Sequence, residues 1–119
     1  MKSLLLTGAT GFVGQRLLHS LEEKDKRIKV RLISRRLHKK HETVIRDLQT
    51  DSITSDVLRG VDTVFHLAGN AHVMQESSNI DNLYRSLNVT ATVRLAELAV
   101  ERGIKRFVFA SSSSVYGSD

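Results

Sequence analysis

The sequence predicts an α/β fold, in which a parallel, doubly wound sheet carries helices on both faces. Two observations predict it. Short apolar runs alternate along the chain with longer segments of helical periodicity. The first apolar run, residues 4–6, ends at a glycine-rich turn that leads directly into a helical pattern. Right-handed crossovers between parallel strands then give the strand order 3-2-1-4-5, which is that of a Rossmann-like sheet.

The pattern of apolar residues assigns the elements. Strands are expected at residues 2–7, 28–34, 43–46, 61–67 and 105–110. Helices are expected over residues 11–24, 52–59 and 80–102. The last two helices should end at Gly60 and Gly103, because glycine readily adopts the left-handed conformation that terminates a helix. The long helix carries an apolar stripe formed by Leu83, Leu87, Ala91, Leu95 and Leu98.

The composition limits the class of protein. A chain of 119 residues is one domain at most, and 40% hydrophobic with 26% charged residues is typical of a soluble globular protein. The absence of cysteine excludes disulfides, Cys-ligated metals and thiol catalysis, and it fits a cytoplasmic location. The first apolar run stops at Gly8, too early for a signal peptide or a membrane span, so we expect no membrane association.

Positive charge is concentrated in one stretch. The net charge is +5, and ten of the eighteen Lys and Arg residues lie between Lys24 and Arg46. Such a patch is compatible with nucleic-acid binding, with a solvated edge of the domain or with a local anion site. No aromatic residue interleaves with these charges, so the stacking platform of a single-strand binder is absent. Nucleic acid is therefore not the expected partner.

The glycine-rich turn is the first candidate site. Gly8, Gly11 and Gly14 follow one another at three-residue spacing between a strand and a helix. A helix N-terminus offers unpaired N–H groups and a partial positive charge, and glycine lets the backbone approach a phosphate closely. The turn predicts cofactor contacts from Gly8, Thr10, Gly11, Phe12, Val13 and Gly14. A purely structural turn between strand and helix is the alternative.

The ends of the second and third strands predict where the adenosine half of a dinucleotide lies. An NAD site usually places a carboxylate after the second strand, but this chain has Ser34, Arg35 and Arg36 there. Arginine binds a 2′-phosphate that a carboxylate would repel, so NADP is favoured over NAD. Asp47 and Leu48, after the third strand, are candidates to receive the adenine. The alternatives are exposed loop arginines and an ordinary turn aspartate.

Small residues after the fourth strand suggest a further contact with the cofactor. Leu67, Ala68 and Gly69 allow the backbone to approach a ligand. His66 lies within the strand pattern and is interpreted as a structural histidine, and His72 lies in the following loop. No His or carboxylate has metal-ligand spacing with His72, so no metal is expected.

Polar residues on the long helix and after the fifth strand complete the candidate set. Asn88 sits in mid-helix, where asparagine is unfavourable by propensity and usually ties elements together by hydrogen bonds. Ser111 and Ser112 begin a run of four serines at the end of the fifth strand, where their hydroxyls would face the ligand cleft. A flexible exit loop is the alternative, and no nucleophile-elbow context supports a serine hydrolase.

Several of these motifs occur together in a known family. Residues 7–14 are similar to T-G-x-x-G-F-x-G, 47–48 to an adenine-contacting acidic pair, 66–69 to H-L-A-A, 88–90 to the start of N-V-x-G-T, and 111–117 to S-S-x-x-V-Y-G. The chain departs from the pattern at Gly69, where Ala is usual, and at Ala91, where Gly is usual. It resembles the N-terminal part of extended short-chain dehydrogenases/reductases, the NAD(P)-dependent sugar-nucleotide epimerase/dehydratase family.

The resemblance implies hydride transfer between the nicotinamide and a sugar carbon, usually C4. Ser112 would hydrogen-bond the sugar oxygen, and a Tyr-x-x-x-Lys pair, absent from these 119 residues, would move the proton. Residues 1–119 are therefore expected to be an inactive cofactor-binding fragment that lacks the catalytic Tyr/Lys and the substrate-binding part.

The resemblance also implies partners. Residues 72–74 are similar to members that act on UDP-N-acetylhexosamines in surface-polysaccharide synthesis, as 4-epimerases or 4-ketoreductases. Helix 80–102 would form a homodimer interface in the full-length protein, and its apolar stripe would be partly exposed in the fragment. A non-catalytic, NADP-binding sensor or interaction module is the alternative function.

Overall fold

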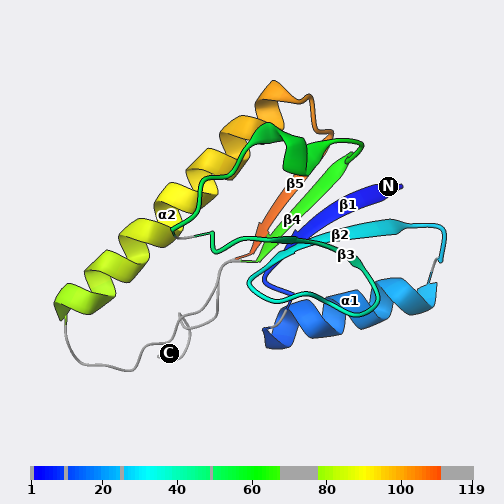
Figure 1. Cartoon of the computed structure of the whole chain (residues 1–119), viewed down its shortest axis with the longest axis horizontal. Helices are drawn as coiled ribbons and strands as arrows, with labels where there is room; N and C mark the ends of the chain where they lie inside the picture. The colour runs from blue at the N-terminus through cyan, green and yellow to red at the C-terminus, as the bar shows by residue number, and fades with distance from the viewer. Residues whose placement is uncertain (1, 10, 25, 49, 68–77, 111–119) are drawn as a thin grey trace.

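The computed structural model describes residues 2–9, 11–24, 26–48, 50–67 and 78–110, and only the backbone of residues 78–88 (Figure 1). Its elements are β1 (Ser3–Thr7), α1 (Phe12–Lys24), β2 (Lys29–Ser34), β3 (Glu42–Ile45), the 3₁₀ helix η1 (Ser55–Leu58), β4 (Thr63–Leu67), α2 (Ser78–Glu101) and β5 (Arg106–Ala110). The predicted strands all occur, with bounds that differ by two residues or fewer.

The strands form one parallel sheet in the order β3-β2-β1-β4-β5, as the sequence predicts. β1 lies in the centre, where Thr7 is the register partner of Ile33 in β2 and of His66 in β4. The carboxyl ends of β1, β2 and β4 therefore meet at one edge. Ligands of doubly wound sheets bind at this edge, at the point where the strand order reverses.

The two faces of the sheet are covered by different helices (Figure 1). On one face, Leu4 and Leu6 of β1 and Leu32 of β2 are buried with Leu18 of α1. Leu5 points to the opposite face, where it packs with residues of β2, β4, η1 and α2. The alternation along β1 follows from the two-residue period of a strand. Because both faces are covered, β1 reads as a continuous apolar run in the sequence.

The apolar stripe of α2 is buried in the half of the helix whose side chains the structure describes, and the side chains of Leu83 and Leu87 lie outside the described part. Ala91, Leu95 and Leu98 are 8% exposed or less, and Leu95 and Leu98 pack against residues of the sheet and η1. Other apolar residues of α2 are exposed instead, namely Val89, Val93 and Val100. Gly103 ends the segment with φ +70°, as predicted. Within the described part of the chain, no helix combines the length and apolar character needed to cross a bilayer.

The helix expected over residues 52–59 is wrong in extent, since only η1 forms. Thr54 is extended and its hydroxyl bonds to Asp56, while Arg59 leaves the helical conformation. The guanidinium of Arg31, from β2, donates to the carbonyl oxygens of Val57 and Arg59 at 2.7 and 2.9 Å. The side chain of Arg31 thus satisfies these two carbonyl oxygens in place of a further helical turn.

A carboxylate fixes the amino ends of β1 and β4 together. Asp62, just before β4, accepts hydrogen bonds from the backbone N–H groups of Lys2 at 2.9 Å and Ser3 at 3.1 Å. The hydroxyl of Thr63 donates to its other oxygen at 2.6 Å. The hydrogen bond from Thr63 has the largest effect, and together with these N–H groups it lowers the pKa of Asp62 to about 2. The Asp62 carboxylate is therefore ionised at neutral pH and already occupied by donors.

Candidate cofactor-binding site

The turn after β1 has a geometry that suits an anion-binding site. Gly8 has φ +78°, and its carbonyl oxygen accepts the N–H of Gly11 at 3.1 Å. α1 begins directly afterwards at Phe12 and has no acidic residue in its first turn. The helix N-terminus therefore presents N–H groups with no carboxylate nearby on the helix to compete for them.

The three glycines have different roles. A Cβ atom on Gly8 would overlap the carbonyl oxygen of Leu67, and a Cβ on Gly14 would overlap the carbonyl oxygen of Gly8 and lie 2.8 Å from the Cα of Ala9. A Cβ on Gly11 would meet only the oxygen of Gly8, at an ordinary 3.6 Å. Gly8 and Gly14 are therefore required by the packing of the chain itself. Nothing in the described protein requires Gly11, which leaves its Cα surface open to a ligand.

The start of α1 carries exposed apolar side chains beside the turn. Phe12 and Val13 are 77% and 60% exposed. The guanidinium carbon of Arg16 lies 5.6 Å from the centre of the Phe12 ring, a cation–π contact. The two residues predicted to contact the cofactor after Gly11 thus lie at the surface, where a ligand can reach them.

The end of β2 forms a tight turn that carries two exposed arginines. The hydroxyl of Ser34 accepts the backbone N–H of Arg36 at 3.2 Å, and its carbonyl oxygen accepts the N–H of Arg46 at 3.0 Å. The side chains of Arg35 and Arg36 are exposed. Ser34 therefore shapes the turn, a role that its residue type allows but that sequence reasoning missed. No carboxylate occupies the three positions after the apolar part of β2.

The loop after β3 brings Leu48 next to α2. Asp47 donates its backbone N–H to the carboxylate of Asp51 at 2.6 Å, and the Asp51 N–H returns to the Asp47 carbonyl at 2.8 Å. Leu48 lines a pocket of about 380 Å³ whose other wall includes Thr90 and Arg94 of α2. Asp51 was not among the residues predicted from the sequence. The signal was an aspartate four residues after Asp47, a spacing that closes a turn.

His66 is a structural histidine, which agrees with its interpretation from the strand pattern. Its Nδ1 lies 2.7 Å from the Thr7 hydroxyl of β1, and its Nε2 lies 2.9 Å from the Thr92 hydroxyl of α2. The ring of Phe109 stacks on it with a centroid distance of 5.5 Å. Burial lowers the pKa of His66 to about 4, so the ring is neutral at pH 7.

Several predicted residues lie outside the described part of the chain. These are Thr10, Ala68, Gly69, Ser111 and Ser112, and the side chain of Asn88. Their assignments to the cofactor or to catalysis stay predictions. Among the described residues, no group of three or more His, Asp or Glu side chains is placed to hold a metal ion.

Comparison with known proteins identifies the family. A family model described as "NAD dependent epimerase/dehydratase family" matches residues 4–119. The chain belongs to this family. The resemblance drawn from the motifs is thereby confirmed, and the Rossmann-like fold agrees with that of solved members.

Two curated proteins with different names are similar to the chain. It is 38% identical over 120 residues to UDP-glucose 4-epimerase of Vibrio cholerae, covering 98% of this chain and 36% of the relative. It is 32% identical over 121 residues to a 3-beta-hydroxysteroid dehydrogenase of Mycolicibacterium neoaurum, covering 94% of this chain and 32% of the relative.

A solved structure agrees in fold and holds a dinucleotide. MoeE5 in complex with UDP-glucose and NAD superposes with a TM-score of 0.77 at 37% identity, covering 98% of this chain and 38% of that chain. The chain thus spans about a third of the length of these proteins, 32–38%.

Proposed function

We propose that the chain is the cofactor-binding part of an NAD(P)-dependent nucleotide-sugar epimerase or 4-ketoreductase. The observation that carries the proposal is the glycine turn at the end of β1. Gly8 and Gly14 are needed for packing, whereas Gly11 is open in front of the N-terminus of α1. An open glycine at a helix N-terminus, at the switch point of a parallel sheet, suits a pyrophosphate.

Each described residue has a defined part in this proposal. The N–H groups at the start of α1 would bind the pyrophosphate, with Phe12 and Val13 packing beside it. Asp47 and Leu48 would contact the adenine, since Leu48 lines the pocket against α2. His66 would act indirectly, because its hydrogen bonds connect β1, β4 and α2 below the turn. When bound, the nicotinamide supplies hydride chemistry, which we assign to C4 of the sugar.

The substrate proposal rests on similarity to proteins whose names specify UDP-sugars, together with the pairing of UDP-glucose and NAD in MoeE5. Ser112 would hydrogen-bond the reacting sugar oxygen. The name of another relative, 32% identical, specifies a steroid instead. We therefore base the UDP-sugar assignment on the more similar relatives. A role in polysaccharide synthesis and a cytoplasmic location belong to the same proposal.

Residues 1–119 alone are expected to bind the cofactor without turning over a UDP-sugar. They contain Ser112 but no Tyr-x-x-x-Lys pair that could move the proton. The measurement is conversion of UDP-glucose in the presence of NAD or NADP, with the UDP-glucose 4-epimerase of Vibrio cholerae as the positive control. Cofactor binding is measured on the same sample, to show that the chain is folded. Measurable conversion would contradict the proposal.

NADP is expected to bind more tightly than NAD, by about tenfold or more, because a charge-assisted bond from an arginine to the 2′-phosphate is worth about 1.5–3 kcal/mol. The exposed Arg35 and Arg36 after β2 support this preference, whereas the NAD held by MoeE5 supports the other cofactor. The test is titration of both cofactors against the wild type and against Arg35→Ala/Arg36→Ala.

The variant should lose the preference for NADP and keep its affinity for NAD. Lys39→Ala, which removes an exposed charge further along the same loop, is the matched control and should bind both cofactors as the wild type does. Equal affinity of the wild type for NAD and NADP would overturn the assignment of the 2′-phosphate to these arginines.

We also propose that the whole protein forms a homodimer through α2. Val89, Val93 and Val100 are exposed on the helix at spacings of four and seven residues, so they share one face. Exposed apolar residues gathered on one face mark an interaction surface more often than scattered ones do. This face differs from the Ala91–Leu95–Leu98 stripe, which the sheet already covers.

A further inference from the structure

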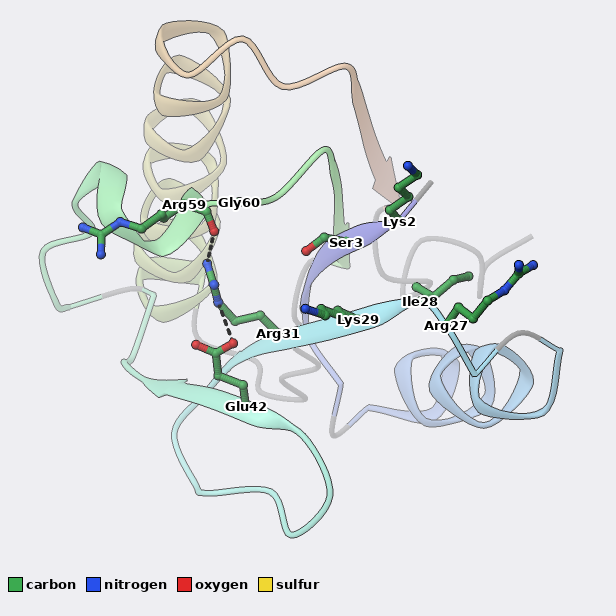
Figure 2. A pocket seen from close by; sticks show the side chains of 9 residues that line it. All are labelled: Lys2, Ser3, Arg27, Ile28, Lys29, Arg31, Glu42, Arg59 and Gly60. Atoms are coloured by element: carbon green, nitrogen blue, oxygen red, sulfur yellow. Dashed lines mark hydrogen bonds and ion pairs between the residues drawn. The ribbon is translucent and has the colours of Figure 1, made fainter.

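A pocket of about 780 Å³ opens at the amino edge of the sheet, opposite the candidate cofactor site (Figure 2). It lies where β1, β2 and β3 begin and where the chain enters β4 after η1. Doubly wound sheets bind their ligands at the carboxyl edge, so the proposed function makes no use of this pocket.

The pocket is lined by cations that come from separate parts of the chain. Lys2 precedes β1, Arg27 precedes β2, and Lys29 and Arg31 lie within β2. Lys29 is the register partner of Ser3, and its backbone N–H donates to the carbonyl oxygen of Lys2 at 2.9 Å. The fold therefore brings Lys2, distant in sequence, to the edge of the basic stretch. If the basic stretch were only a solvated loop, there would be no reason for Lys2 to lie beside it.

Arg31 is fixed in place and closes one side of the pocket. Its terminal nitrogen donates to the carbonyl oxygens of Val57 and Arg59. Its Nε lies 3.1 Å from the carboxylate of Glu42 (Figure 2). Glu42 is the single carboxylate among the lining residues, and Arg31 offsets its charge. Arg59 contributes its carbonyl oxygen, while its side chain extends away from Arg31 in Figure 2.

The remaining lining charges are therefore positive. Among the described lining residues, Glu42 is the carboxylate, and it lies against Arg31 rather than against Lys2 or Lys29. The ionised carboxylate of Asp62 lies beside the pocket wall, where it accepts the N–H groups of Lys2 and Ser3 and the Thr63 hydroxyl, and it offsets part of the positive charge there. The hydroxyl of Ser3 adds a neutral donor to the lining.

We propose that this pocket binds a small anion that carries several phosphate groups, at a site separate from the dinucleotide. The volume lies within the range of small-molecule pockets, roughly 300–1,000 Å³. Lysine binds phosphate as a mobile point charge, so Lys2 and Lys29 suit a chain of phosphates better than a single rigid carboxylate. None of the described lining residues is aromatic, which disfavours a stacked single-stranded nucleic acid.

The experiment is calorimetric titration of the full chain with inorganic tripolyphosphate at low ionic strength, where exposed charges are least screened. Lys2→Gln/Lys29→Gln removes two charges from the pocket. Lys24→Gln/Lys39→Gln removes the same number of charges from exposed positions outside it, and so controls for net charge. We expect a loss of affinity of tenfold or more in the pocket variant and less than twofold in the control, about 1.4 against 0.4 kcal/mol.

Three further measurements complete the test. Thermal melting of both variants shows that they are folded. Saturating NAD should leave tripolyphosphate binding unchanged, because the two sites lie at opposite edges of the sheet. ATP distinguishes the source of the phosphates: tighter binding of ATP than of tripolyphosphate assigns a nucleotide, and equal binding assigns the inorganic anion.

The proposal is overturned if the wild type does not bind tripolyphosphate, or if both double variants lose affinity equally. Displacement of the anion by NAD would place it in the cofactor site instead. Binding of a single-stranded oligonucleotide in preference to the small anions, with affinity that falls steeply as salt is added, would assign the surface to nucleic acid. These outcomes test the amino edge alone, so the proposed dinucleotide site stands or falls separately.

Discussion

Replacing Gly14 with alanine is expected to lower the free energy of unfolding by about 3 kcal/mol, or to prevent folding. The added methyl would overlap the carbonyl oxygen of Gly8 and press on the Cα of Ala9 at 2.8 Å. Both are backbone atoms of the turn, so no side-chain rotation can relieve the overlap. The measurement is chemical denaturation followed by circular dichroism.

Gly11→Ala is the matched control, because the same methyl at Gly11 would meet only the Gly8 oxygen at 3.6 Å. Its stability should lie within about 1 kcal/mol of the wild type. Its affinity for a dinucleotide should fall at least tenfold if the pyrophosphate lies against Gly11, as proposed. Equal stability of Gly14→Ala and Gly11→Ala would contradict the packing argument, and unchanged cofactor affinity of Gly11→Ala would contradict the position of the pyrophosphate.

Acidification is expected to destabilise the fold through His66. Its pKa is about 4 in the folded chain, against 6.5 for an unperturbed histidine. Between these values the unfolded chain binds a proton that the folded chain does not, so stability is full above about pH 6.5 and falls toward pH 4. The shift corresponds to a loss of up to about 3 kcal/mol, from one group buried among Thr7, Thr92 and aromatic rings.

The measurement is the free energy of unfolding from pH 7 to pH 4 for the wild type and His66→Gln. The variant should be less stable than the wild type at pH 7. Because glutamine cannot titrate, the variant should lose less stability on acidification. His19→Gln is the control, because it removes a histidine whose side chain is 70% accessible on α1 and leaves the buried His66 in place. An identical pH slope for the wild type and His66→Gln would contradict the buried, neutral state of the ring.

Features encoded by neighbouring residues were predictable from the sequence. The strand order follows from alternating elements and right-handed crossovers, and the structure confirms it. The turn at Gly8 follows from glycine spacing, and Gly60 and Gly103 have positive φ where helices were expected to end. Each of these depends on a few consecutive residues, so a local pattern suffices to reveal it.

Features that depend on contacts between distant residues were missed. η1 is short, and the carbonyl oxygen of Val57 near its end accepts a hydrogen bond from Arg31, a residue 26 positions earlier. Asp62 joins β1 to β4 across 60 positions from Lys2. In the candidate site, the separate roles of Gly11 and Gly14 depend on which backbone atoms surround each Cα. A periodicity argument contains none of these distances.

The close approach of Gly8 to Leu67 has a consequence for motion. Surface turns usually open independently, at little cost in free energy. Here no methyl fits between the turn after β1 and the end of β4, and His66 holds the preceding residue, Thr7. The turn therefore cannot open while the centre of the sheet stays closed. The proposed pyrophosphate site would therefore share the cooperative stability of the sheet, with its N–H groups oriented before a ligand arrives.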